Sequence, residues 1–259
     1  VPPLPRAGQG GPVLLGSDHT GCRHSGGATG KITMTELGHL LVADAVFSAL
    51  GWPQLVRPAL YLGAIAPDAH RATVGVDYRD LHFRSSRTVG RRLIDFLRRY
   101  LRPALTGGDE EAQAFYCGWL SHVCADHVWR QHLRHDLSAV WYRITEVSLL
   151  ESAALRDEFY EDCDCVDQQL YALHRQQVEE ARELLQYSQA TYTVPPLRGS
   201  DILRWRKHVT MELLPPPPPG LESPLLLSLA LVERCVTEAT EETLSILDYE
   251  IQRTDRDEG

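Results

Sequence analysis

The sequence predicts an all-α protein built as one large domain. From Met34 onward, apolar residues recur with a period close to 3.6, and the alternation typical of strands is almost absent. The chain has 259 residues, of which 43% are hydrophobic. This is enough to bury one sizeable core.

The first helix is predicted by an apolar stripe that follows Met34. The stripe consists of Leu41, Val42, Ala45, Val46 and Ala49. Gly51 and Pro53 end this helix, because neither residue favours helical continuation. Residues 1–33, which precede it, are rich in glycine and proline and have no period. We therefore expect a flexible leader over 1–33 and a single domain over 34–259.

Four further helices are predicted in the central part of the chain. The second carries a stripe and ends at Pro103 and Gly107–Gly108; the stripe is Leu93, Phe96, Leu97, Tyr100 and Leu101. The third runs from about Glu110 past Trp129, and the fourth from about Asp136 to Arg156. The fifth is marked by Leu170, Leu173, Val178, Ala181 and Leu185.

A polyproline spacer within residues 214–222 precedes the last predicted helix. Pro215–Pro219 are consecutive prolines and form a stiff extended segment. Ser223 is the expected N-cap and Pro224 the expected first helical residue. The apolar stripe of this helix is Leu225, Leu229, Val232, Val236 and Ala239.

Charge and composition exclude several classes of protein. The chain has 26 basic and 35 acidic residues, a net charge of −9, whereas domains that coat duplex nucleic acid are usually basic. No apolar stretch reaches the roughly 18 residues of a membrane span. Val1–Leu15 lack the basic start and apolar centre of a secretory signal. We expect a cytoplasmic protein, with a secreted mature form that has lost its signal as the alternative.

The cysteines do not form a disulfide framework, because six are too few to crosslink a domain of this length. Cys117 and Cys124 fall within an apolar helical pattern and are expected in the core. Cys163 and Cys165 lie in an acidic segment, which we interpret as a turn carrying an exposed pair.

The third predicted helix carries the strongest chemical signal. His122 and Asp126 are four residues apart and share one helix face, which Phe115, Trp119 and Trp129 mark as buried. A buried imidazole and carboxylate must be paired or bound to something. The spacing allows either a shared metal ion or a hydrogen bond between the two side chains.

Three other polar residues stand in apolar surroundings. Asp68 ends the run Gly63–Asp68, His82 follows fourteen residues later, and His39 lies in the first predicted helix. Nitrogen and oxygen donors without thiolates suit zinc, with manganese or iron as weaker options. His70 is a further candidate for lining a cleft, and His127 is expected to have a supporting or structural role.

These motifs resemble those of the zinc-dependent phospholipase C and single-strand nuclease superfamily. The matching pieces are Leu37-Gly38-His39 with Val42-Ala43, the run ending at Asp68, His82-Phe83, and Gly118–Asp126 followed by His132. The resemblance covers about residues 34–150. It implies an all-α, phospholipase C-like bundle with up to three zinc ions at the bottom of a cleft.

The resemblance also implies a set of ligands. Carried over by position, a first zinc ion would be held by Asp68, His82, His122 and Asp126. Asp126 would bridge to a second ion bound by His39, which the family completes with the amino terminus of a mature Trp; here Met34 stands at that position. His132 and Glu146 would serve a third ion, but Tyr142 occupies the position of a histidine. We expect one tight ion, a weaker second ion and no complete third site.

The expected function is that of a metal-dependent hydrolase. Metal-activated water would attack a phosphoester of a small or lipid-like anionic substrate, and Asp68 would steer or deprotonate that water. Arg84 and Arg87 belong to a basic cluster suited to an anion. One alternative uses the same metal as a Lewis acid in a hydrolase, lyase or cyclase of secondary metabolism. The other is a non-catalytic binding module with a structural metal.

Overall fold

The computed structural model describes residues 33–83, 89–138, 141–142, 153–214, 224 and 226–257. Within these ranges the chain forms helices and turns and no strand, which confirms the all-α prediction. The predicted leader before Thr33 and the proline run after Leu214 lie outside the described residues. No helix in the described part is both long and apolar enough to cross a membrane.

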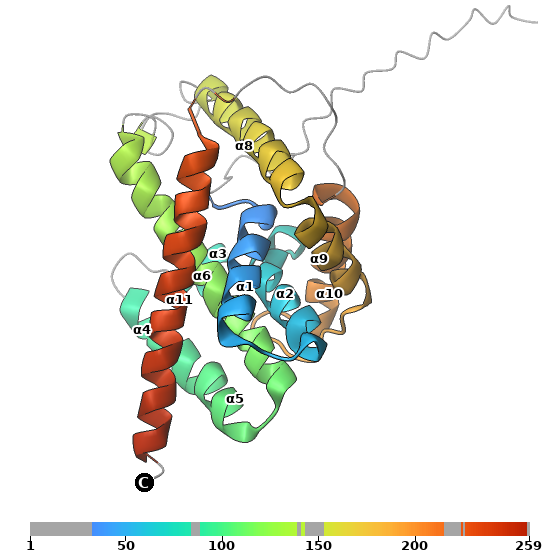
Figure 1. Ribbon diagram of the computed structural model, residues 1–259, viewed down its shortest axis with the longest axis vertical. Helices are drawn as coiled ribbons and strands as arrows, with labels where there is room; N and C mark the ends of the chain where they lie inside the picture. The colour runs from blue at the N-terminus through green and yellow to red at the C-terminus, as the bar shows by residue number, and fades with distance from the viewer. Residues whose placement is uncertain are drawn as a thin grey trace, which may run out of the picture.

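Helices α1 (Glu36–Leu50), α2 (Arg57–Ile65) and α6 (Glu110–Asp136) form the centre of the fold. In Figure 1, α1 and α2 lie between the long α11 (Leu229–Asp257) on one side and α9 (Arg175–Tyr187) and α10 (Gly199–His208) on the other. Helix α1 begins at Thr35, whose hydroxyl accepts from the Gly38 amide. It ends at Gly51, whose φ of 62° is a left-handed conformation that glycine adopts without strain. The predicted first helix is confirmed.

Helices α2 and α6 approach each other through two glycines. A Cβ added to Gly63 would overlap the carbonyl oxygen of Phe115, and one added to Gly118 would overlap that of Leu60. The two backbones are therefore in direct contact. Trp119 and Leu120, which follow Gly118 in α6, are fully buried. This contact sets the distance between α2 and the functional face of α6.

The second predicted helix continues past Pro103. Helix α4 (Val89–Phe96) leads through a π-helical turn (Leu97–Leu101) into α5 (Arg102–Gly107). Pro103 lies in the first turn of α5, directly after the π-helical turn, and the chain remains helical through it, so the proline does not end the helix. Gly108, with a φ of 72°, ends it instead.

The fourth and fifth predicted helices differ from those observed. Helix α6 itself extends to Asp136, and much of the predicted 136–156 segment lies outside the described residues. The fifth is two helices, α8 (Ala153–Leu173) and α9 (Arg175–Tyr187), which separate at His174. Cys163 and Cys165 lie inside α8 and are buried, so the interpretation as an exposed turn is wrong. Asp164, the one residue between them, is half-buried on the same helix.

The last helix begins later than the sequence predicted. Helix α11 starts at Leu229, and the Ser228 hydroxyl accepts from the Leu231 amide as a cap, so Ser223 and Pro224 do not start it. The buried Asp162 carboxylate of α8 accepts from the amides of Leu226 and Leu227 and holds this stretch outside the helix. The predicted stripe is otherwise present, with Val232 and Ala239 buried.

The remaining elements surround the centre. Helix α3 (Tyr78–Leu81) is a single turn that follows the 3₁₀ segment Ala66–Ala72. Helix α10 (Gly199–His208) packs on that 3₁₀ segment and continues into a π-helical turn, Val209–Leu213. Helix α11 packs along α6 and α1.

Candidate metal centre

Five polar side chains from four parts of the chain meet at one buried point. They are His39 of α1, Asp68 of the 3₁₀ segment, His82 directly after α3, and His122 and Asp126 of α6. Each is at most 2% exposed. The fold thus brings together the residues that the sequence placed in separate motifs. It leaves three imidazoles and two carboxylates in a site without solvent.

Four donor atoms of this cluster have the spacing of a tetrahedral ligand set. The Nε2 atoms of His82 and His122 are 2.9 Å apart, and Asp68 Oδ1 lies 3.3 and 3.9 Å from them. Asp126 Oδ2 lies 3.7 Å from His82 Nε2. Zinc bonds of about 2.0–2.1 Å in a tetrahedron place ligand atoms about 3.3 Å apart. The observed distances lie on both sides of that value and are compatible with a shared zinc ion. Donor atoms within 4.8 Å of one another fall into two sets, one of His39, His122 and Asp126 and one of Asp68, His70 and His82.

The Nδ1 atoms of the two central histidines face backbone carbonyls. His82 Nδ1 lies 3.0 Å from the Tyr78 carbonyl oxygen, and His122 Nδ1 lies 2.7 Å from that of Ala64. A carbonyl only accepts, so each Nδ1 must carry a proton. Burial lowers the pKa of His82 to about 4, so its ring is neutral at pH 7 and its Nε2 has a free lone pair. This tautomer is the one that a metal ligand needs, since it leaves Nε2 available for a cation.

His39 supplies a second, unused pair of donors. Its ring stacks on His122 with centroids 3.6 Å apart, and its Nε2 lies 3.7 Å from Asp126 Oδ1. Neither ring nitrogen has a hydrogen-bond partner among the described residues, although the side chain is fully buried. An unsatisfied buried imidazole is destabilising unless a ligand binds it. His39 therefore fits a ligand of a second cation shared with Asp126.

Each carboxylate of the cluster has an arginine against it. Arg71 Nη2 lies 2.9 Å from Asp68 Oδ2, and Arg130 Nη2 lies 3.1 Å from Asp126 Oδ2. Burial by itself would raise the pKa of both carboxyls, but the guanidinium groups hold those pKa values well below the usual range. Both aspartates are therefore ionised, the form in which they bind a metal.

Tyr78 contacts two of the five residues. Its hydroxyl donates to Asp126 Oδ2 at 2.7 Å and accepts from Arg130, and its ring stacks on His82 with centroids 3.7 Å apart. Sequence analysis did not single out Tyr78, Arg71 or Arg130. A signal was present, since each lies three or four residues from a candidate ligand along a helical turn.

Other candidates lie apart from the cluster. Both ring nitrogens of His132 contact carboxylates outside it, Asp136 at 2.9 Å and Glu238 of α11 at 2.8 Å. Tyr142 is 61% exposed, and Glu146, Arg84 and Arg87 lie outside the described residues. Among the residues that the structure describes, no set of ligands for a third metal ion surrounds His132.

The two lesser histidine candidates differ in position. His70 borders the cluster, with its Nδ1 3.8 Å from Asp68 Oδ1 and 3.1 Å from the Pro67 carbonyl oxygen. His127 is exposed on α6, and its ring contacts Gln131 at 2.6 Å. Only His70 is near enough to influence the centre.

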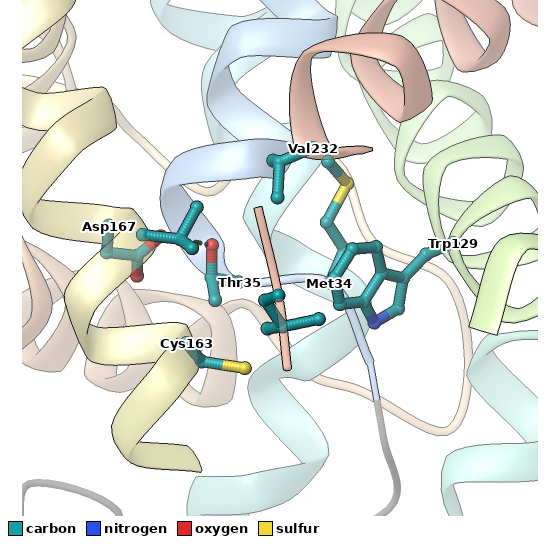
Figure 2. Close-up of a pocket in the computed structure, with 8 residues that line it drawn as sticks. Met34, Thr35, Trp129, Cys163, Asp167 and Val232 are labelled. Atoms are coloured by element: carbon teal, nitrogen blue, oxygen red, sulfur yellow. Dashed lines mark hydrogen bonds between the residues drawn. The ribbon is translucent and has the colours of Figure 1, made fainter. Parts of the chain in front are cut away.

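A pocket opens beside the cluster at Met34. The Met34 backbone N–H donates to Asp126 Oδ1 at 3.2 Å, and the Met34 side chain lines the pocket. Figure 2 shows most of the lining, which is Met34, Thr35, Trp129, Cys163, Val166, Asp167, Leu227 and Val232. The Thr35 hydroxyl donates to the Asp167 carboxylate at 2.7 Å. The pocket is mainly apolar, and Met34, which lines it, also contacts Asp126 through its backbone N–H.

Comparison with known proteins gives one match. A family described as zinc dependent phospholipase C matches residues 34–183. The matched range contains all five residues of the cluster. Neither a curated protein nor a solved structure matches the chain.

Proposed function

The chain belongs to the zinc-dependent phospholipase C family, and on that premise we propose that it is a zinc hydrolase of phosphoester bonds in a small or lipid-like anionic substrate. The facing Nε2 atoms of His82 and His122, with Asp68 and Asp126 beside them, are the observation that carries the proposal. A bound cation would stabilise this arrangement of nitrogen and oxygen donors.

The residues of the cluster divide between two ions in this proposal. The first zinc ion would be held by Asp68, His82, His122 and Asp126, and a second, weaker one by His39 and Asp126. A catalytic zinc ion needs a coordination position open to water or substrate, and the second site, with two ligands from the chain, would leave such positions. An ion there would polarise a phosphoryl oxygen and lower the pKa of a bound water molecule. His132 is engaged with Asp136 and Glu238, which supports a centre without a third ion.

Asp68 is the proposed catalytic residue. Arg71 fixes its Oδ2 atom, which leaves Oδ1 directed toward His82 and His122. A carboxylate with a lowered pKa is a weak base, so Asp68 is suited to accept a hydrogen bond from the nucleophilic water and orient it. It is less suited to keep that proton, which would pass to the leaving group or solvent.

Arg84 and Arg87 remain proposed contacts for the phosphoester anion. Their side chains follow His82-Phe83 in the sequence, directly after a residue of the cluster. Guanidinium groups match phosphate oxygens with two parallel hydrogen bonds. Variants at these two positions should raise KM for an anionic substrate with less effect on kcat.

An assay on three synthetic esters tests the reaction class. We expect zinc-loaded protein to hydrolyse bis(4-nitrophenyl) phosphate and a short-chain phosphatidylcholine, and to leave 4-nitrophenyl acetate unchanged. Asp68→Asn should reduce kcat by roughly a hundredfold or more, the effect of removing a positioned acid–base group. His127→Asn, an exposed histidine on α6, is the matched control and should retain activity.

The alternative reactions give different results in the same assay. Turnover of the carboxylic ester alone would contradict phosphoester hydrolysis and support the Lewis-acid alternative with a carbonyl substrate. No turnover of any ester, with zinc firmly bound, would support the binding module with a structural metal.

A further inference from the structure

Most of the negative charge around the cluster is already balanced by the chain. Asp68, Asp126 and the buried Glu36 carry three negative charges, and Arg71 and Arg130 carry two positive charges. Arg71 lies 2.9 Å from Asp68 and 2.6 Å from Glu36, and Arg130 lies 3.1 Å from Asp126. Histidine binds a metal in its neutral form, so the imidazoles add no charge to a metal-bound cluster. The chain therefore contributes one net negative charge to the metal-bound centre.

Both oxygens of Asp126 already have partners within the chain. Oδ1 accepts the Met34 N–H, while Oδ2 accepts the Tyr78 hydroxyl and contacts Arg130. Arg130 is 4% exposed, and its Nε has no hydrogen-bond partner within the described part of the chain. Burial of a guanidinium with an unsatisfied donor is unfavourable, so its charge at this position is balanced by a specific interaction. That interaction is with the carboxylate that two cations would have to share.

We propose that Arg71 and Arg130 limit this centre to one resident divalent cation and make a second cation depend on a bound phosphoester anion. The inference rests on the zinc centre of the proposed function. One dication changes the net charge of the centre from −1 to +1, and a second changes it to +3. Two dications about 3.5–4 Å apart repel four times as strongly as two unit charges, and a buried site screens that repulsion poorly.

A phosphodiester removes this obstacle. It brings a negative charge and two free oxygens that can each bind one cation. Its binding and the binding of the second cation are then coupled, and each increases the affinity of the other by the same factor. In a two-metal site, the second metal ion supplies positive charge next to the carboxylates. In this centre, Arg71 and Arg130 supply that positive charge permanently.

Cobalt titration of the metal-free protein tests the proposal, because Co²⁺ reports its coordination by visible absorption as well as by stoichiometry. We expect the wild-type chain to bind one Co²⁺ without an anion and two in the presence of dimethyl phosphate. The Kd of the second ion should fall at least about tenfold when the anion is added.

Variants separate the charge of the arginine from its structural role. Arg130→Gln should bind two Co²⁺ without dimethyl phosphate, whereas Arg130→Lys, which keeps the charge, should still bind one. Arg57→Gln is the matched control, since Arg57 is also buried against carboxylates, Asp44 at 2.5 Å and Glu180 at 2.6 Å. It should bind one ion, as the wild type does.

Three results would overturn or redirect the proposal. Two tightly bound ions in the wild type without an anion, or one ion in a folded Arg130→Gln, would overturn it. If circular dichroism shows that Arg130→Gln does not fold, Arg71→Gln replaces it, because the Arg71 side chain is 34% exposed and easier to substitute. A wild-type chain that binds no Co²⁺ would instead contradict the metal centre, and with it the proposed function.

Discussion

At the scale of the residue, the centre depends on side chains that hold the candidate ligands in place. Tyr78 touches His82 with its ring and its carbonyl oxygen, and Asp126 with its hydroxyl. Arg71 and Arg130 keep the two carboxylates ionised. Residues that orient metal ligands commonly affect affinity almost as much as the ligands do.

Tyr78→Phe should weaken zinc binding by about 10–100-fold, because it removes the hydroxyl that orients Asp126 while keeping the ring on His82. The measurement is competition for zinc with a chelator of known affinity. Tyr61→Phe is the control, since Tyr61 donates a similar buried hydrogen bond to Asp44 at 2.7 Å. Equal zinc affinity in the two variants would show that Tyr78 does not orient Asp126.

Asp126→Asn should lower both zinc content and stability. The substitution leaves Arg130 buried without its anionic partner, which costs about 3–5 kcal/mol. Urea unfolding of the metal-free protein measures this loss separately from the loss of zinc. Asp136→Asn, a partly exposed aspartate on the same helix, should retain zinc and nearly all of the stability. Unchanged zinc content in Asp126→Asn would contradict the assignment of α6 as the helix that supplies metal ligands.

At the scale of the element, the contact between α2 and α6 sets the geometry of the centre. His122 reaches the Ala64 carbonyl oxygen at 2.7 Å because Gly63 and Gly118 let the two helices touch. On its other side, α6 is tied to α11 by the contact of His132 with Glu238. These two contacts permit separate tests.

Gly118→Ala should destabilise the protein by about 1–3 kcal/mol and weaken zinc binding. The added methyl group overlaps the Leu60 carbonyl oxygen, so α2 must move and take the Ala64 carbonyl with it. Gly107→Ala is the matched control, because nothing lies within 4 Å of a Cβ at Gly107. It should change stability by less than about 0.5 kcal/mol. The measurement is urea unfolding, and equal stabilities would contradict close packing of the two helices.

His132 should contribute a pH-dependent stabilisation that is unrelated to zinc. Burial by itself would lower the pKa of His132, but Asp136 and Glu238 raise it above its ordinary value. A raised folded-state pKa stabilises the protein below the unfolded pKa and loses that effect as pH rises through the folded one. The loss of stability in His132→Ala should therefore be greater near about pH 5.5 than near about pH 9, and under about 1 kcal/mol, because the site is partly exposed.

Unfolding of His132→Ala and wild type at both pH values tests the sign of this effect. Plasma mass spectrometry should find the same zinc content in both proteins. Loss of one zinc ion from His132→Ala would show that His132 is a ligand after all. A larger stability loss at high pH would contradict the assigned ion pairs.

At the scale of the whole molecule, helices beyond the family match complete the fold around the centre. The match ends at residue 183, before α10 and α11. Trp205 of α10 is buried and lies 5.7 Å from the Arg71 guanidinium, measured from its ring centre. Cys235 and Ala239 of α11 are fully buried, in a helix that packs on α6 and α1.

A fragment limited to residues 34–183 should therefore fail to fold cooperatively, because removal of α10 and α11 exposes the apolar faces of α6 and α1. A chain of residues 34–259 should fold, since the core described here lies within that range. Circular dichroism with a urea titration measures both. A cooperative transition in the short fragment would show that α10 and α11 are accessory.

Sequence patterns predicted elements best where local signals act alone. Gly51 ended α1 as expected, but Pro103 did not end its helix, because a proline in the first turn of a new helical segment is tolerated. Cys163 looked exposed because its neighbours are acidic, yet its own face of α8 is buried. For Cys163, tertiary packing, which no local pattern contains, decided the outcome.

The candidate site follows the same rule. His39, Asp68 and His82 could be singled out because polar residues in apolar segments are unusual, and the fold brings them to one point. Arg71 and Arg130 could not, since an arginine within a helix ordinarily faces solvent and only the arrangement of α6 and the 3₁₀ segment turns these two inward. That the cluster binds zinc stays a prediction.

The glycine contact between α2 and α6 also has an evolutionary consequence. A side chain at either Gly63 or Gly118 collides with main-chain atoms, and filling both positions adds a second collision and relieves neither. No compensating side-chain substitution nearby can restore the spacing, so selection must keep glycine at each of the two positions independently. A descendant that gains alanine at either one should carry a displaced α2 and a lost hydrogen bond to His122. In an alignment of relatives, glycine at these two positions would therefore indicate that the spacing of the centre is kept, although neither residue bears a functional group.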